Sequence, residues 1–179
     1  MKKETIHVRK LAVLIVFTAL ATAISPFTVF VVSGTKANPT QHMTNAILGV
    51  LLGPFWAVLA AVFIGATRNM LGVGTLFAFP GGMPGGLVVG SVYWILKRLK
   101  RSEKTRLMSA LTEPIGTLLI GVPISIFLFA SWLGTPIANG LLFGAGWALS
   151  CIPGCIIGFT VLLILRRVGI SRETLFGEE

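Results

Sequence analysis

The chain has 179 residues, of which 54% are hydrophobic and only 12% are charged, and its formal net charge is +9. Soluble domains contain roughly 25% charged residues, so this composition excludes an ordinary soluble domain. The positive charge does not indicate a nucleic-acid partner. The basic residues gather in segments 2–10, 97–106 and 166–172, at the ends of long apolar runs, as the positive-inside rule describes for membrane proteins.

The first apolar run, Leu11–Val32, contains no charged residue. It is long enough to span a bilayer, which takes about 20 residues. Its beginning also resembles a signal peptide, with A-x-A cleavage choices at Ala19–Ala21 and Ala21–Ala23. Because the apolar character continues to Val32, we prefer a retained first membrane helix to a cleaved leader. The stretch SGTKANPTQ then breaks the run, with glycine and proline as breakers.

The next segment, HMTNAILGVLLGPFWAVLAAVFIGATRN, would be about 42 Å long as one helix, more than a membrane core requires. Gly53-Pro54 in its middle offers a tight turn. We therefore predict two shorter helices, 41–52 and 54–70, that meet in a hairpin. Small residues at helical spacing predict a close approach of these two helices. They are Gly49 and Gly53 on the first helix and Ala57, Ala61 and Gly65 on the second.

The segment Gly72–Gly86 is rich in glycine and proline, and we predict a loop there, followed by a fourth span over 85–96. A basic loop over 97–106 comes next. The fifth span is predicted over 108–132, with kinks at Pro114 and Pro123. The stretch GTPIANG turns the chain, and the sixth span is predicted over 141–165.

These segments predict an all-α integral membrane bundle of six transmembrane helices in a single domain, 1–179. An even number of spans places both termini on the same side of the membrane. The basic N-terminus 1–10, the loop 97–106 and the tail 167–179 are then all cytoplasmic. The sequence therefore predicts a multi-pass protein of the plasma membrane.

Polar side chains gather at the opposite, outward end of the predicted bundle. Polar groups at membrane depth are costly and by default indicate a functional site. The candidate substrate-binding residues are Lys36, His42, Asn45, Arg68 and Asn69, with Phe79 and Trp147 as aromatic walls. An alternative stays open: these residues solvate helix ends, Arg68 extends its charge to the interface, and the aromatic residues form an interfacial belt.

The type of charge predicts the kind of ligand. The chain contains no Asp, and the one acid within a predicted span, Glu113, is expected near the cytoplasmic end. The outward end carries Lys36 and Arg68 instead, so the ligand is expected to be neutral or mildly anionic. Cys151 and Cys155 are predicted to be packing residues. No catalytic, metal-ligand or nucleotide-binding pattern is present, so we predict no enzyme, cofactor or metal site.

Three stretches, KANPTQHMTNAILGVLLGP, ATRNMLGVGT and AFPGGMPGG, are similar to the ThiW-type permeases for the thiazole precursor of thiamine. The chain as a whole resembles the S components of prokaryotic energy-coupling factor (ECF) transporters. The resemblance implies that it binds hydroxyethylthiazole from outside and then docks on a transmembrane coupling protein powered by two ATPases. It also implies docking through small residues of the first helix, Ala19 and Ala23.

Two other functions stay open. The chain could be an S component for another vitamin precursor or an anionic metabolite, which Lys36 and Arg68 would hold. It could also be a solitary facilitator or channel that works without ATPases.

Overall fold

The computed structural model describes residues 3–32, 35–135 and 137–177. The predicted turn residues Ser33, Gly34 and Pro136, and the outermost residues of both predicted cytoplasmic ends, lie outside these ranges. The helices and strands in chain order are α1 (Lys3–Thr28), β1 (Phe30–Val32), β2 (Thr35–Ala37), α2 (Pro39–Leu51), α3 (Pro54–Met70), α4 (Ala78–Arg98), α5 (Glu103–Leu107), η1 (Met108–Thr112), η2 (Ile115–Gly121), α6 (Val122–Ile124), η3 (Ser125–Phe129), α7 (Ala130–Trp132), α8 (Gly140–Arg167) and α9 (Arg172–Phe176).

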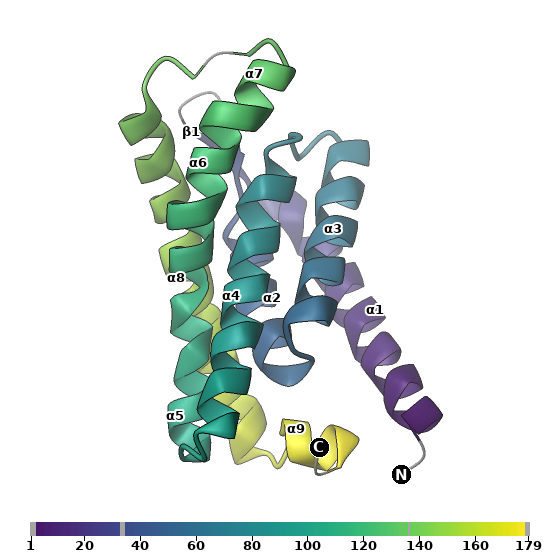
Figure 1. Ribbon diagram of the computed structural model, residues 1–179. Helices are drawn as coiled ribbons and strands as arrows, with labels where there is room; N and C mark the ends of the chain where they lie inside the picture. Colours follow the sequence, from purple (N-terminus) through teal and green to yellow (C-terminus); the bar gives the residue numbers. More distant parts are fainter. Residues whose placement is uncertain (1–2, 33–34, 136, 178–179) are drawn as a thin grey trace.

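Long helical segments run side by side in one bundle (Figure 1). Three of them are long and apolar enough to cross a membrane: Glu4–Thr28, Glu103–Trp132 and Gly140–Arg167. Large apolar side chains such as Phe27 and Phe127 point outward from these helices, at 88% and 74% exposure. The predicted helical bundle is confirmed, whereas six complete membrane crossings stay a prediction.

The predicted hairpin of two short helices is confirmed, since α2 and α3 end and begin on either side of Gly53. The side-chain oxygen of Asn38 caps α2 by accepting a hydrogen bond from the Gln41 backbone N–H at 3.3 Å. Gly53 turns the chain with a φ of 94°, a conformation that glycine adopts without steric cost. Pro54 then starts α3 at a position where its missing N–H is not needed.

The prediction of a loop over 72–86 is wrong, because α4 already begins at Ala78. Its glycines stay helical because they meet neighbouring helices at close range. A Cβ at Gly86 would lie 3.1 Å from that of Ala57 in α3. The predicted packing of the small-residue faces of α2 and α3 against each other is also corrected. Gly49 of α2 faces Val89 of α4, so the small residues of both helices approach α4.

The first predicted span is too long by four residues, because α1 ends at Thr28. β1 and β2 pair as a short antiparallel hairpin in which Val31 lies opposite Lys36. Valine and phenylalanine favour strands, so residues Phe30–Val32 at the end of the apolar run form a strand and not a further helical turn. The all-α prediction does not include this hairpin. It matters for the site because β2 leads directly into α2.

The fifth predicted span is a single helical column with irregular hydrogen bonding. Pro114 precedes the π-helical segment η2, and Pro123 lies in α6, between η2 and the second π-helical segment, η3. A proline inside a helix lacks an N–H and its ring displaces the carbonyl one turn back. Wider π-helical turns accommodate this disturbance without ending the helix. The two prolines predicted as kinks therefore mark changes of helical winding.

The apolar core surrounds the C-terminal half of α2, where Ile47, Leu48 and Leu51 are almost fully buried. The short helix α9 closes this end of the bundle, and its Phe176 is 1% exposed within the same core. The start of α1, α5 and α9 lie at one end of the molecule, and the β hairpin lies toward the other (Figure 1). The basic segments therefore share one end.

Candidate functional site

A small pocket lies at the N-terminal end of α2, away from the apolar core. It holds about 300 Å³ of empty space, its open mouth included. Its walls come from β2, α2, α3, α4 and α8. The lining residues are Lys36, Ala37, Asn38, Gln41, His42, Arg68, Phe77, Ala78, Gly81, Gly82, Trp147 and Ser150. The pocket thus joins segments that are far apart in the sequence.

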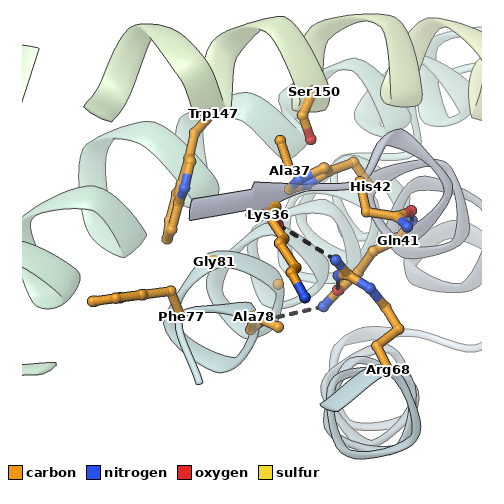
Figure 2. Close-up of a pocket in the computed structure, with 12 residues that line it drawn as sticks. Lys36, Ala37, Gln41, His42, Arg68, Phe77, Ala78, Gly81, Trp147 and Ser150 are labelled. Atoms are coloured by element: carbon orange, nitrogen blue, oxygen red, sulfur yellow. Dashed lines mark hydrogen bonds between the residues drawn. The ribbon is translucent and has the colours of Figure 1, made fainter. Parts of the chain in front are cut away.

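One side of the pocket is polar and firmly held. Gln41 donates to the Ala78 carbonyl at 3.1 Å and accepts a hydrogen bond from Arg68. The Arg68 guanidinium also lies 3.4 Å from the Lys36 carbonyl and is 2% exposed as a residue. Lys36 donates through Nζ to the carbonyl of Gly72. Figure 2 shows this chain of contacts between Lys36, Gln41 and Arg68. Both cations therefore already make contacts that hold the elements together.

The other side of the pocket is aromatic. Figure 2 shows Trp147 and Phe77 across the pocket from Arg68. Phe143 lies between them, with ring centroids 4.8 Å from Trp147 and 5.6 Å from Phe77. Such tilted pairs hold rings rigidly at little entropic cost. The Trp147 ring is close to Gly81, where a Cβ would lie only 2.9 Å away. A flat, apolar ligand would find a pre-formed wall here.

Glu113 lies beside the pocket, and the prediction that it is remote from the polar cluster is wrong. Its Oε1 is 2.7 Å from His42 Nδ1, 2.9 Å from Thr117 Oγ1 and 3.2 Å from Asn45 Nδ2. The glutamate is fully buried, at 0% exposure. The chain runs from Glu103 through α5 and the 3₁₀ helix η1 before it reaches Glu113. Ten residues of such helix advance roughly 15–20 Å, which is far enough to bring Glu113 from the end of the bundle to its middle.

The glycines of α4 make room for this polar network. A Cβ on Gly85 would overlap Glu113 Oε1, and one on Gly82 would overlap the Gln41 side chain. Asn45 donates to the carbonyl of Gly82 at 2.9 Å. The glycine-rich stretch is therefore a helix face shaped to receive polar side chains from two other elements.

The structure brings four of the predicted substrate-binding residues to the pocket wall: Lys36, His42, Arg68 and Trp147. The other three lie outside it. Asn45 contacts Glu113 behind the wall, and Asn69 donates to the carbonyls of Gly65 and Thr75 at the end of α3. The Phe79 ring packs against Gly65.

Sequence reasoning missed Gln41, Phe77 and Ser150 as lining residues. Gln41 stands in the same polar stretch as His42, one residue before it, so its position was visible. Ser150 is one of two hydroxyl residues in the apolar helix α8, and its Oγ is buried without a hydrogen-bond partner among the described residues. Such an atom is an available partner for a ligand. Nothing in the local sequence separates Phe77 from Phe79.

The two small residues proposed for partner docking lie on a different surface. Ala19 and Ala23 are exposed on α1. They line an apolar groove between α1 and α3, together with Phe63 and Leu71. This groove shares no lining residue with the polar pocket.

The fold and the pocket define a small helical membrane protein with a polar, partly aromatic pocket inside the bundle. The family model of the thiamine-precursor transporter protein (ThiW) matches residues 11–168. The chain therefore belongs to the ThiW family and is a membrane protein of thiamine-precursor transport. Searches of curated proteins and of solved structures gave no significant match.

Proposed function

We propose that this chain is the substrate-binding S component of an ECF-type importer and that it captures hydroxyethylthiazole at the outer face of a prokaryotic plasma membrane. The observation that carries the proposal is the pocket itself, in a chain of the ThiW family. Its aromatic side suits a flat heteroaromatic ring. Its polar side offers hydrogen-bonding groups for a ring nitrogen and one hydroxyl.

In the proposed complex the ring stacks on Trp147, with Phe77 beside it. The buried hydroxyl of Ser150 and the amide of Gln41 stand close enough to the pocket to meet the ligand hydroxyl. His42 meets the ring nitrogen.

Binding is tested by calorimetric titration of the purified chain in detergent with hydroxyethylthiazole. We expect saturable binding, and replacing Trp147 with alanine should weaken it by about tenfold, because an aromatic contact is lost. The matched control is Trp132→Ala, since Trp132 is 76% exposed and lies outside the pocket. Absence of saturable binding below millimolar concentration by a folded protein would contradict the proposal.

Docking on a coupling protein is proposed through the face of α1 that carries Ala19 and Ala23. Small residues allow two membrane helices to approach closely. Ala19→Trp should abolish co-purification with the coupling protein and its two ATPases while leaving ligand binding intact. The control is Ala12→Trp, because Ala12 is also exposed on α1 but does not line the groove.

Reconstitution into lipid vesicles distinguishes the proposed S component from a solitary facilitator. Vesicles that contain this chain alone should show no uptake of labelled hydroxyethylthiazole, and adding the energising proteins with ATP should start it. Rapid uptake by the chain alone would favour the facilitator.

An anionic ligand is the second candidate, because Lys36 and Arg68 both line the pocket. The contacts of Arg68 with Gln41 and with the Lys36 carbonyl weaken this reading, since they occupy much of its guanidinium. Competition between hydroxyethylthiazole and its phosphate ester decides between the two. We expect the neutral alcohol to bind more tightly.

A further inference from the structure

A buried carboxylate stands directly behind one pocket residue. Glu113 is 0% exposed, and its Oε1 lies within hydrogen-bond distance of His42 Nδ1, Thr117 Oγ1 and Asn45 Nδ2. Hydrogen bonds donated to a carboxylate favour its ionised form. An ionised Glu113 can only accept, so Nδ1 of His42 must carry the proton between the two residues.

Apart from His42, the described hydrogen-bond partners of Glu113 do not neutralise its charge. Thr117 and Asn45 are neutral, and the nearest pocket cations, Arg68 and Lys36, make their hydrogen bonds to Gln41 and to backbone carbonyls. A buried ionised carboxylate without a cationic partner is strongly unfavourable. The imidazole of His42, 2.7 Å away, is the group that can supply the positive charge by taking a second proton.

His42 transmits this charge to the pocket. Its side chain keeps 10% exposure and lines the cavity, whereas Glu113 is wholly enclosed. With Nδ1 turned to Glu113, Nε2 is the nitrogen left for a ligand. In the imidazolium form Nε2–H is a donor, and in the neutral form with Nδ1 protonated it is an acceptor. The protonation state of His42 therefore decides which ligand atom it can meet.

We propose that Glu113 keeps His42 in the imidazolium form, so that Nε2–H donates a hydrogen bond to the ring nitrogen of the ligand. The site thereby selects a neutral thiazole and rejects an N-alkylated thiazolium, the form of this ring in thiamine itself. Glu113 is a positioning residue in this scheme, and His42 makes the contact. The inference rests on the proposed function, and it identifies the unalkylated ring nitrogen as the group that the pocket recognises.

Two effects add up against the thiazolium. Its quaternary nitrogen has no lone pair, so the donor on His42 is left unpaired. It also carries a positive charge into a pocket where the charges of His42 and Glu113 cancel, leaving those of Lys36 and Arg68. Sites built around a hydrogen bond reject ligands that lack the partner by large factors, so we expect a difference of about 100-fold or more.

The first test uses the unmodified full-length chain in detergent and three probes. They are hydroxyethylthiazole, its N-methyl thiazolium, and the thiophene isostere in which CH replaces the ring nitrogen. We expect the thiazole to bind about 100-fold more tightly than either analogue. If the thiazole binds and the analogues bind equally well, the inference is overturned while the proposed function stands. If none of the three binds to folded protein, the proposed function fails and the inference fails with it.

The second test observes the proton directly. The chain contains two histidines, so ¹⁵N-histidine labelling gives two imidazole signals, and His7→Asn assigns them. We expect His42 to show the shifts of an imidazolium at neutral pH and those of a neutral ring in Glu113→Gln. The Gln variant should also narrow the gap between thiazole and thiazolium, whereas a merely structural role would weaken all ligands equally. A neutral His42 in the unmodified chain would refute the inference without any variant having to fold.

Discussion

At the scale of single residues, the site depends on polar side chains of α2 that have partners on other elements. Gln41, His42 and Asn45 are all buried. Their hydrogen-bond partners are Arg68 of α3, backbone carbonyls of α4, and Glu113. The sequence predicted the polar stretch, because such residues are conspicuous between apolar runs. It could not predict that Glu113 completes the network, because that requires the depth each helix reaches in the bundle.

The network gives a prediction for Gly85→Ala. The added methyl group would displace the Glu113 carboxylate from its place beside His42. Leaving a buried polar group unsatisfied costs about 1–3 kcal/mol, so ligand affinity should fall about tenfold or more. Calorimetric titration measures the change.

The matched control is Gly144→Ala in α8, where a Cβ meets Val122 at an ordinary 3.6 Å. This variant should bind normally and be as stable as the parent or slightly more so, because alanine favours helices. Equal binding by Gly85→Ala and the parent would contradict the assigned role of the network.

At the scale of elements, the sequence predicted one feature correctly and misled on another. Gly53-Pro54 correctly predicted the turn between α2 and α3, because each residue has a definite conformational preference at its position. The glycine-rich stretch misled, because glycine in isolation disfavours a helix. Close packing of Gly85 and Gly86 against other elements outweighs that preference, and such packing is a tertiary property.

Gly53→Ala tests the turn. Gly53 has a φ of 94° and a ψ of 178°, a conformation essentially confined to glycine that costs a residue with a Cβ about 1–3 kcal/mol. The new Cβ would also lie 3.2 Å from the Trp94 indole nitrogen. Thermal unfolding in detergent should therefore show a clear loss of stability. Gly169→Ala separates the two causes, because Gly169 has a φ of 82° and no neighbour within 4 Å. It should lose the backbone part alone and be the more stable of the two.

The docking of α9 should depend on pH through Glu173. Burial alone would raise the pKa of this carboxyl, but hydrogen bonds from its own backbone N–H and from Ser171, with attraction to Arg106 and Lys97, lower the pKa overall. A lowered pKa stabilises the folded state above the unfolded value of about 4.3, and this stabilisation is lost as pH falls through the folded value.

Hydrogen exchange of residues 171–177 should therefore accelerate, relative to the core of α2, when the pH is lowered from 7 to about 3 after correction for intrinsic rates. The Glu173→Gln variant should exchange faster at neutral pH and show little further change. An unchanged exchange ratio in the unmodified chain would contradict this role of the 3.3 Å Arg106–Glu173 pair.

At the scale of the whole molecule, the two halves of α2 lie in different surroundings. Its C-terminal half sits in an apolar core closed by α9, and its N-terminal half opens into the pocket. Composition predicted the helical membrane class, and motif resemblance predicted the ThiW family, which the family match over 11–168 confirms. The positions of the apolar core and of the pocket along α2 depend on which helices contact each other. Hydropathy alone does not predict those contacts.

The most direct test of the account is an experimental structure of the chain with hydroxyethylthiazole bound. We predict ligand density between Trp147 and His42, with the ring nitrogen within hydrogen-bond distance of His42 Nε2 and with Glu113 still on Nδ1. Density only in the apolar groove beside Ala19 and Ala23, with the polar pocket unchanged, would contradict the central claim that the pocket binds the transported precursor.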